Sequence, residues 1–114
     1  GETKLQQQAI KQPTWTTPTF LNSWVNYSVD WAQCGYYKDN QGIVHLRGLV
    51  KSGTIGAAIF QLPTGYRPAK VCTFPSITND SLGRINVDAS GNVIAVFGNN
   101  AWFSIDGVTF LAEG

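Results

Sequence analysis

The sequence predicts a single all-β domain, a sandwich or a barrel, and three observations lead to that prediction. From Trp15 onward, β-branched and aromatic residues recur in short runs. Gly, Asn, Asp and Pro interrupt these runs about every ten residues, a spacing that is typical of sandwiches and barrels. No stretch after Pro13 has the length and periodicity of a helix. With 114 residues, the chain has room for one hydrophobic core.

The first thirteen residues differ from the rest of the chain. They are rich in Gln and Lys and end at Pro13, so we expect a linker over 1–13 and the domain over 14–114, with a coiled-coil end as the weaker alternative. The chain lacks Met altogether, from which we expect a piece of a longer protein. Within the domain we expect strands at 24–27, 35–38, 42–51, 58–62, 71–77, 82–88, 92–97, 101–105 and 108–112.

The strand over 42–51 shows the clearest alternation. One face is suited to a core and carries Val44, Leu46, Gly48 and Val50. The opposite face is mixed and carries Ile43, His45, Arg47, Leu49 and Lys51. A mixed face is typical of contact with another subunit rather than with water alone, so we predict a subunit interface made by Ile43, His45, Arg47 and Leu49.

The connections between strands carry recognisable turn chemistry. Segments 39–42, 88–92 and 98–100 supply the Asp, Asn and Gly residues that tolerate positive φ. Asp106-Gly107 is the dipeptide of a two-residue type I′ hairpin, from which we expect the last four strands to form a meander. Proline denies the backbone a donor, so 61–68 is expected to be a loop and Pro75 to lie at a sheet edge or bulge.

Charge and composition exclude several classes of partner. The net charge is +1 with no basic cluster, which argues against nucleic acid. No apolar run approaches the roughly 20 residues of a membrane span, so no membrane insertion is expected. Cys34 and Cys72 allow at most one disulfide, and we favour two buried free thiols because the core needs no covalent support.

Motifs for catalysis or metal binding are missing from the sequence. The single histidine, His45, has no HxH, HExxH or CxxC pattern beside it, and no cofactor or metal is expected. Asp39, Asp88 and Asp106 fall in turns, where a structural role suffices. Asp30 and Asp80 leave a glycoside hydrolase open as a minor alternative. We therefore expect a protein that is not an enzyme.

Exposed aromatic residues beside amides are more informative about function than the histidine and the acidic residues are. An aromatic ring covers the apolar face of a pyranose, while Asn and Asp pair with its hydroxyl groups. Turns carry binding function more often than strands do. We therefore predict a saccharide-binding site formed by Trp31, Tyr37, Asn79, Asp80, Asn99, Asn100 and Trp102, with core or subunit contact as the alternative for each aromatic residue.

Four segments together carry a resemblance to a known family. Residues 35–51 read GYYKDNQGIVHLRGLVK, 53–56 read GTIG, 62–68 read LPTGYRP and 83–92 read GRINVDASGN. This combination resembles the C-terminal receptor-binding domains of the tail fibres of tailed bacteriophages. The resemblance implies an antiparallel, jelly-roll-like β-sandwich that forms a homotrimer at the tail tip of the virion and binds a host cell-surface glycan or other receptor.

The same resemblance implies a role for the segment before the domain and leaves one alternative function open. Residues 1–13 become the end of a fibre stalk, and the rest of the tail fibre becomes a partner. No binding residue is carried over, because the matched segments look like framework. The alternative is a trimerisation or folding domain at the end of a fibre, with no ligand of its own.

Overall fold

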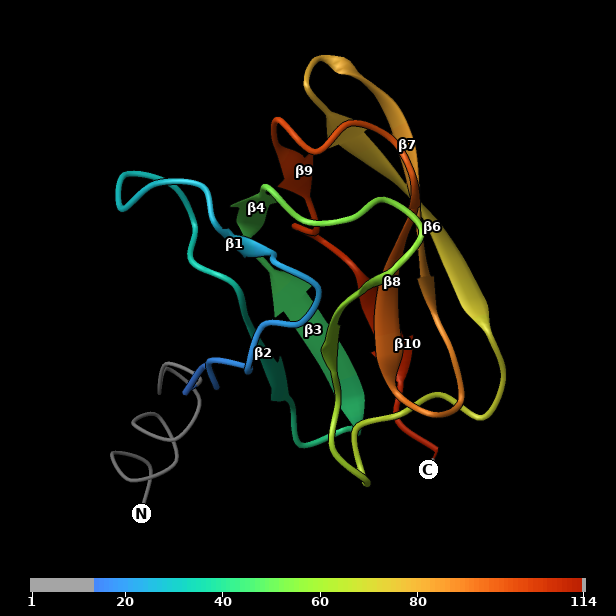
Figure 1. Ribbon diagram of the computed structural model, residues 1–114. Coiled ribbons are helices and arrows are strands. Elements are labelled where there is room, and N and C mark those ends of the chain that lie inside the picture. Colours follow the sequence, from blue (N-terminus) through green and yellow to red (C-terminus); the bar gives the residue numbers. More distant parts are fainter. Residues whose placement is uncertain (1–13, 114) are drawn as a thin grey trace.

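The computed structural model describes residues 14–113, so the predicted linker over 1–13 lies outside the described residues (Figure 1). The described residues form an all-β structure without helices, so none of them belongs to a helix that could cross a membrane. Its ten strands are β1 (Val25–Asn26), β2 (Gly35–Lys38), β3 (Ile43–Arg47), β4 (Leu49–Lys51), β5 (Ala58–Gln61), β6 (Cys72–Thr78), β7 (Ser81–Val87), β8 (Asn92–Phe97), β9 (Phe103–Ser104) and β10 (Thr109–Leu111).

One layer is organised around β3 and β4, which only Gly48 separates. β2 and β10 flank β3, and β1 and β9 flank β4, all in antiparallel pairs. The strand predicted over 42–51 is therefore broken at one residue. Gly48 has φ +138°, and a Cβ there would lie 2.6 Å from the Cα of Cys34, so only glycine fits.

The Asp106-Gly107 dipeptide forms a bulge, and the predicted hairpin at this position is wrong. β9 and β10 do not pair with each other, because β9 pairs with β4 and β10 with β3. Four positions separate His45 from Leu49, whereas five separate their partners Thr109 and Ser104. One extra residue in a strand defines a β-bulge, and a glycine with positive φ is common in bulges as well as in hairpin turns.

The second layer is a four-stranded antiparallel sheet in the order β5-β8-β7-β6. β6, β7 and β8 follow one another as hairpins, but the chain then leaves this sheet for β9 (Figure 1), so the predicted meander of the last four strands is wrong. Pro75 lies in β6, which is an edge strand, as predicted. Pairing between distant segments determines the topology, because β9 and β10 form their backbone hydrogen bonds with strands that lie more than fifty residues earlier in the chain.

A single core cluster joins both layers, which is the arrangement expected of a β-sandwich. Trp24, Phe60 and Phe103 are its largest fully buried side chains. Val44 and Leu46 are buried as predicted from the alternation. Both cysteines are free, with Cys34 buried and Cys72 half-buried, so the expectation of free thiols is confirmed but full burial holds for only one.

One of the four predicted interface residues, Leu49, is not accessible to a neighbouring subunit. Ile43, His45 and Arg47 are half-buried on the outward face of β3, but Leu49 is only 7% exposed. The segment that follows β1 folds over Leu49, whose backbone carbonyl accepts a hydrogen bond from Tyr27 at 2.8 Å. Leu49 is therefore covered by its own chain and exposes almost nothing to a neighbouring subunit.

Candidate functional site

Three of the seven predicted site residues line one pocket. Trp31, Asp80 and Trp102 come together there from distant parts of the chain. The full lining consists of Tyr27, Trp31, Leu49, Ile77, Asp80, Trp102, Ser104 and Asp106. The pocket has a volume of about 340 Å³, at the lower end of the range of about 300–1,000 Å³ that is usual for ligand sites. This volume is appropriate for a small ligand or one unit of a polymer.

The loop between β1 and β2 supplies the first aromatic wall. Trp31 is 58% exposed, and its ring lies edge-on to that of Tyr27 at a centroid distance of 6.3 Å. The side-chain amide of Gln33 donates to the carbonyls of Ser28 at 2.8 Å and Trp31 at 3.1 Å, which fixes the loop from within. An exposed tryptophan therefore stands on a hydrogen-bonded support, which limits the conformational entropy lost on binding.

The tip of the β6–β7 hairpin forms the second wall. Asn79 and Asp80 occupy a two-residue turn with φ values of 46° and 64°, the signature of type I′. This turn sets Asp80 at the rim, next to Ile77, which is 54% exposed. In Figure 1 this tip and the loop after β1 stand on either side of β9. Asn79 shares the turn but does not line the pocket.

The base of the pocket comes from β9 and the residues around it. Trp102 is half-buried and precedes β9, while Ser104 ends it. The bulge follows directly and brings Asp106 into the lining, where its Oδ1 accepts a hydrogen bond from the Gly48 amide at 2.8 Å. One carboxylate oxygen thus holds the bulge, which leaves Oδ2 for other partners.

Two carboxylates and three aromatic rings determine the chemistry of the pocket. Within residues 14–113, neither Asp80 nor Asp106 has a basic side chain within ion-pair distance. Lys51 contacts one lining residue, since its Nζ lies 5.5 Å from the centroid of Tyr27, but it does not itself line the pocket. The described residues contain no group of three or more metal-ligating side chains. The pocket offers flat apolar surfaces beside strong hydrogen-bond acceptors.

The remaining predicted site residues lie elsewhere or serve the backbone. The Oδ1 atom of Asn99 accepts from the Ala101 amide at 2.7 Å, and Asn100 donates its side-chain amide to the Gly53 carbonyl at 3.0 Å. Both are therefore turn-forming residues outside the pocket. Tyr37 stacks on His45 and does not line the pocket.

Tyr37 belongs to a stacked cluster on the outward face of β2 and β3. Its ring stacks on His45 at 4.6 Å and meets Trp15 edge-on at 4.5 Å. Arg47 lies over the Trp15 ring at 4.2 Å. At the other end, the His45 Nε2 is 3.0 Å from the Asp39 Oδ2, and this hydrogen bond is the main cause that lowers the pKa of Asp39. The rings of this cluster pack on one another, but the Arg47 Nε is buried and has no hydrogen-bond partner among the described residues.

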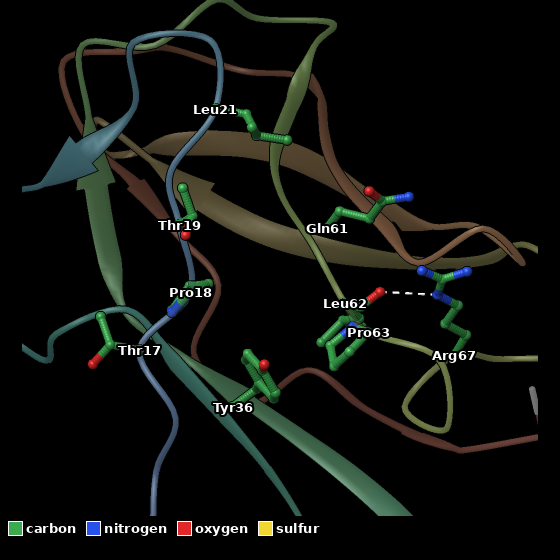
Figure 2. Close-up of a pocket in the computed structure, with 9 residues that line it drawn as sticks. All are labelled: Thr17, Pro18, Thr19, Leu21, Tyr36, Gln61, Leu62, Pro63 and Arg67. Carbon is green, nitrogen blue, oxygen red and sulfur yellow. Dashed lines mark hydrogen bonds between the residues drawn. The ribbon is translucent and has the colours of Figure 1, made fainter.

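A second pocket, of about 380 Å³, lies between residues 17–21 and the end of β5 (Figure 2). Its cationic residue, Arg67, points its Nε to the carbonyl of Leu62 at 2.9 Å, as Figure 2 shows. The only aromatic residue in the lining is Tyr36, which is 8% exposed. This second pocket therefore lacks the accessible rings that distinguish the first.

Sequence reasoning missed Tyr27 and Asp106 as lining residues. Tyr27 belongs to the same aromatic-rich segment as Trp31, so the composition of that segment could have indicated Tyr27 as a lining residue. Asp106 was assigned to a hairpin turn, and only the bulge reveals that it turns toward the pocket. Searches of family models, curated proteins and solved structures found no match to this chain. The function of the pocket therefore has to be inferred from its own residues.

Proposed function

We propose that this domain is a binding module that is not an enzyme and that recognises a host cell-surface saccharide through the pocket lined by Trp31, Trp102 and Asp80. The observation that carries the proposal is a tryptophan with 58% of its surface exposed in a concave site. Such rings cover the apolar face of a pyranose, and the carboxylates accept hydrogen bonds from its hydroxyl groups.

The position of the single histidine supports binding over catalysis. His45 is 3.0 Å from Asp39 on the outward face of β3 and is not a lining residue of the pocket. The minor alternative of a glycoside hydrolase paired Asp80 with Asp30, but Asp30 is not among the lining residues. General acid or base chemistry at Asp80 and Asp106 would be seen as release of labelled product from a bound glycan.

The proposal includes the larger assembly that the sequence resemblance implies. The domain would form the tip of a phage tail fibre, as a homotrimer at the tail tip of the virion, joined to the rest of the fibre. The nested pairing of β3–β4 with β10–β9, β5 with β8 and β6 with β7 is that of a long hairpin folded on itself, which supports a jelly-roll-like architecture. Three weak sites on one tip would gain avidity.

The proposed trimer contact is the outward face that carries Ile43, His45 and Arg47. Sedimentation at micromolar concentration tests it, and a monomer would contradict it. A second candidate function is a trimerisation domain without a ligand, and it is favoured by Arg47 on this face, whose Nε has no hydrogen-bond partner among the described residues. That candidate predicts a trimer that binds no glycan.

A glycan array tests the binding function directly. The wild-type domain should give reproducible hits that the Trp31→Ala variant loses. Val29→Ala is the matched control, because Val29 is 90% exposed in the same loop and does not line the pocket. Both variants should keep the wild-type melting temperature. Silence of the wild type across the array and host-envelope fractions would refute the proposal, as would equal binding by Trp31→Ala.

A further inference from the structure

We propose that the ligand of this pocket carries an ammonium group, and that it is a saccharide with a free, unacetylated amine. The inference rests on the proposed function, since it names the class of saccharide that the same site would take. It follows from the juxtaposition of Asp80, Asp106, Trp31 and Trp102 around one volume of about 340 Å³.

The charge balance of the pocket is the first step. Asp80 and Asp106 reach it from opposite layers of the sandwich, one from the β6–β7 turn and one from the bulge after β9. No lining residue is cationic, although the chain as a whole has a net charge of +1. The negative character is therefore local to the pocket and does not reflect an acidic surface.

Two basic side chains lie over aromatic rings and form no ion pair with Asp80 or Asp106 within the described residues. Lys51 places its Nζ over the ring of Tyr27 at 5.5 Å, and Arg84 lies over the ring of Phe97 at 5.7 Å. Neither lines the pocket. A ligand that covers the pocket would therefore remove water from two carboxylates without supplying them a protein counter-ion.

The energetic comparison of ligands follows from that desolvation. An anionic sugar would meet like charges, which is unfavourable at the effective dielectric of a protein surface. A neutral sugar would have to satisfy both carboxylates with hydroxyl groups alone, and any lone pair left unpaired carries a penalty. An ammonium group supplies three donors and the opposite charge at once.

The aromatic rings favour the same class of ligand. A cation within about 6 Å of a ring centroid is attracted by the negative face of the ring, most strongly for tryptophan. The Tyr27 ring is already in contact with Lys51, whose Nζ lies 5.5 Å from its centroid, so the other two rings are the ones left for a ligand cation. Trp31 and Trp102 add two indole rings beside the carboxylates. The combination of rings and acids is suited to an amino sugar.

Calorimetry with two oligosaccharides of equal length tests the inference. The probes are a β-1,4-linked glucosamine tetramer and its fully N-acetylated counterpart, which differ only at the nitrogen. At a slightly acidic pH the wild type should bind the free amine at least about tenfold more tightly. Asp80→Asn and Asp106→Asn should each reduce this preference severalfold, and both variants should remain folded at the temperature of the measurement.

These two variants change charge while keeping the local structure. Asparagine is favoured at the positive φ of position 80, and at position 106 its Oδ1 can still accept from the Gly48 amide. Asp88→Asn is the matched control, because Asp88 lies at the other end of β7, away from the pocket. It should leave the preference unchanged.

The possible failures of the two proposals are distinguishable. If both tetramers bind equally and Trp31→Ala abolishes both, the saccharide function stands and the requirement for an amine is wrong. An equal loss of preference in Asp88→Asn would also overturn the inference, because it would show a general charge effect. If neither tetramer binds and the array gives no hits, both proposals fall.

Discussion

Replacing Asp106 with alanine tests the bulge that organises both the sheet and the pocket. The Asp106 Oδ1 accepts the Gly48 amide at 2.8 Å, and Gly48 is a buried residue with φ +138°. In Asp106→Ala this amide loses its partner. Hydrogen bonds to charged groups contribute about 1.5–3 kcal/mol, and a buried donor left unpaired costs about 1–3 kcal/mol. We therefore expect a loss of about 2 kcal/mol in the free energy of unfolding.

Chemical denaturation measures this loss, and a thermal scan should show a fall of roughly 8 °C in Tm for a domain of this size. Asp106→Asn is the control, because it retains an acceptor oxygen in a weaker, uncharged hydrogen bond and should lose no more than about 1 kcal/mol. Equal destabilisation by both variants would refute the role of the hydrogen bond. A stable alanine variant would show that water or another group satisfies the Gly48 amide.

Three further predictions follow from contacts in the core and at the first hairpin. Gly53→Ala should cost at least about 2 kcal/mol of unfolding free energy, because a Cβ there would lie 2.0 Å from the buried ring of Trp24; chemical denaturation checks it, and a neutral effect would mean that the ring can move. Burial raises the pKa of Cys34 to about 12, so its thiol stays protonated in the folded state while the unfolded thiol ionises near 9.0. The sign of the linkage is a stability that falls as pH rises above about 9, by up to about 1.4 kcal/mol per unit, and Cys34→Ala should flatten that fall in alkaline denaturation series. A hydrogen bond with His45 lowers the pKa of Asp39, so its stabilisation is present above the ordinary carboxyl pKa and is lost as pH falls through the lowered value. In His45→Ala, NMR titration should show the Asp39 pKa moving back up, and an unchanged value would contradict this cause.

Local patterns predicted much of the secondary structure, because they depend on neighbouring residues. The burial of Val44 and Leu46 follows from two-residue alternation along β3. The turn at Asp88 is held by its own Oδ1, which accepts from the amides of Ser90 at 3.0 Å and Asn92 at 2.9 Å. Such side-chain contacts span few residues and are legible in sequence.

The order of strands could not be predicted, because it depends on pairing between distant segments. An Asp-Gly dipeptide between two strands fits both a type I′ hairpin and a bulge within one longer strand. In this chain Gly48 favours the bulge over the hairpin, because its close approach to Cys34 interrupts the facing strand at the same level. A break in one strand and an extra residue in its partner are coupled features that no single window of sequence contains.

The candidate pocket depends on that same long-range pairing. Residue type made Trp31 and Asp80 candidates for binding, yet nothing local indicated that they line the same pocket. Tyr37 had the same composition around it but stacks on His45 and does not line the pocket. Residue type predicted candidates for binding, and strand pairing selected among them.

The bulge at Asp106 links the fold of the domain to the chemistry of its pocket. In a regular antiparallel pair, side chains alternate between faces, and an extra residue changes which face the following side chains occupy. The insertion lets Asp106 use one carboxylate oxygen for the Gly48 amide while the side chain still lines the pocket. Because that hydrogen bond fixes the carboxylate, a ligand that uses the other oxygen meets an already oriented group. Ordering this side chain would then cost a ligand little, which favours the discrimination between an amine and its acetylated form that we propose for this pocket.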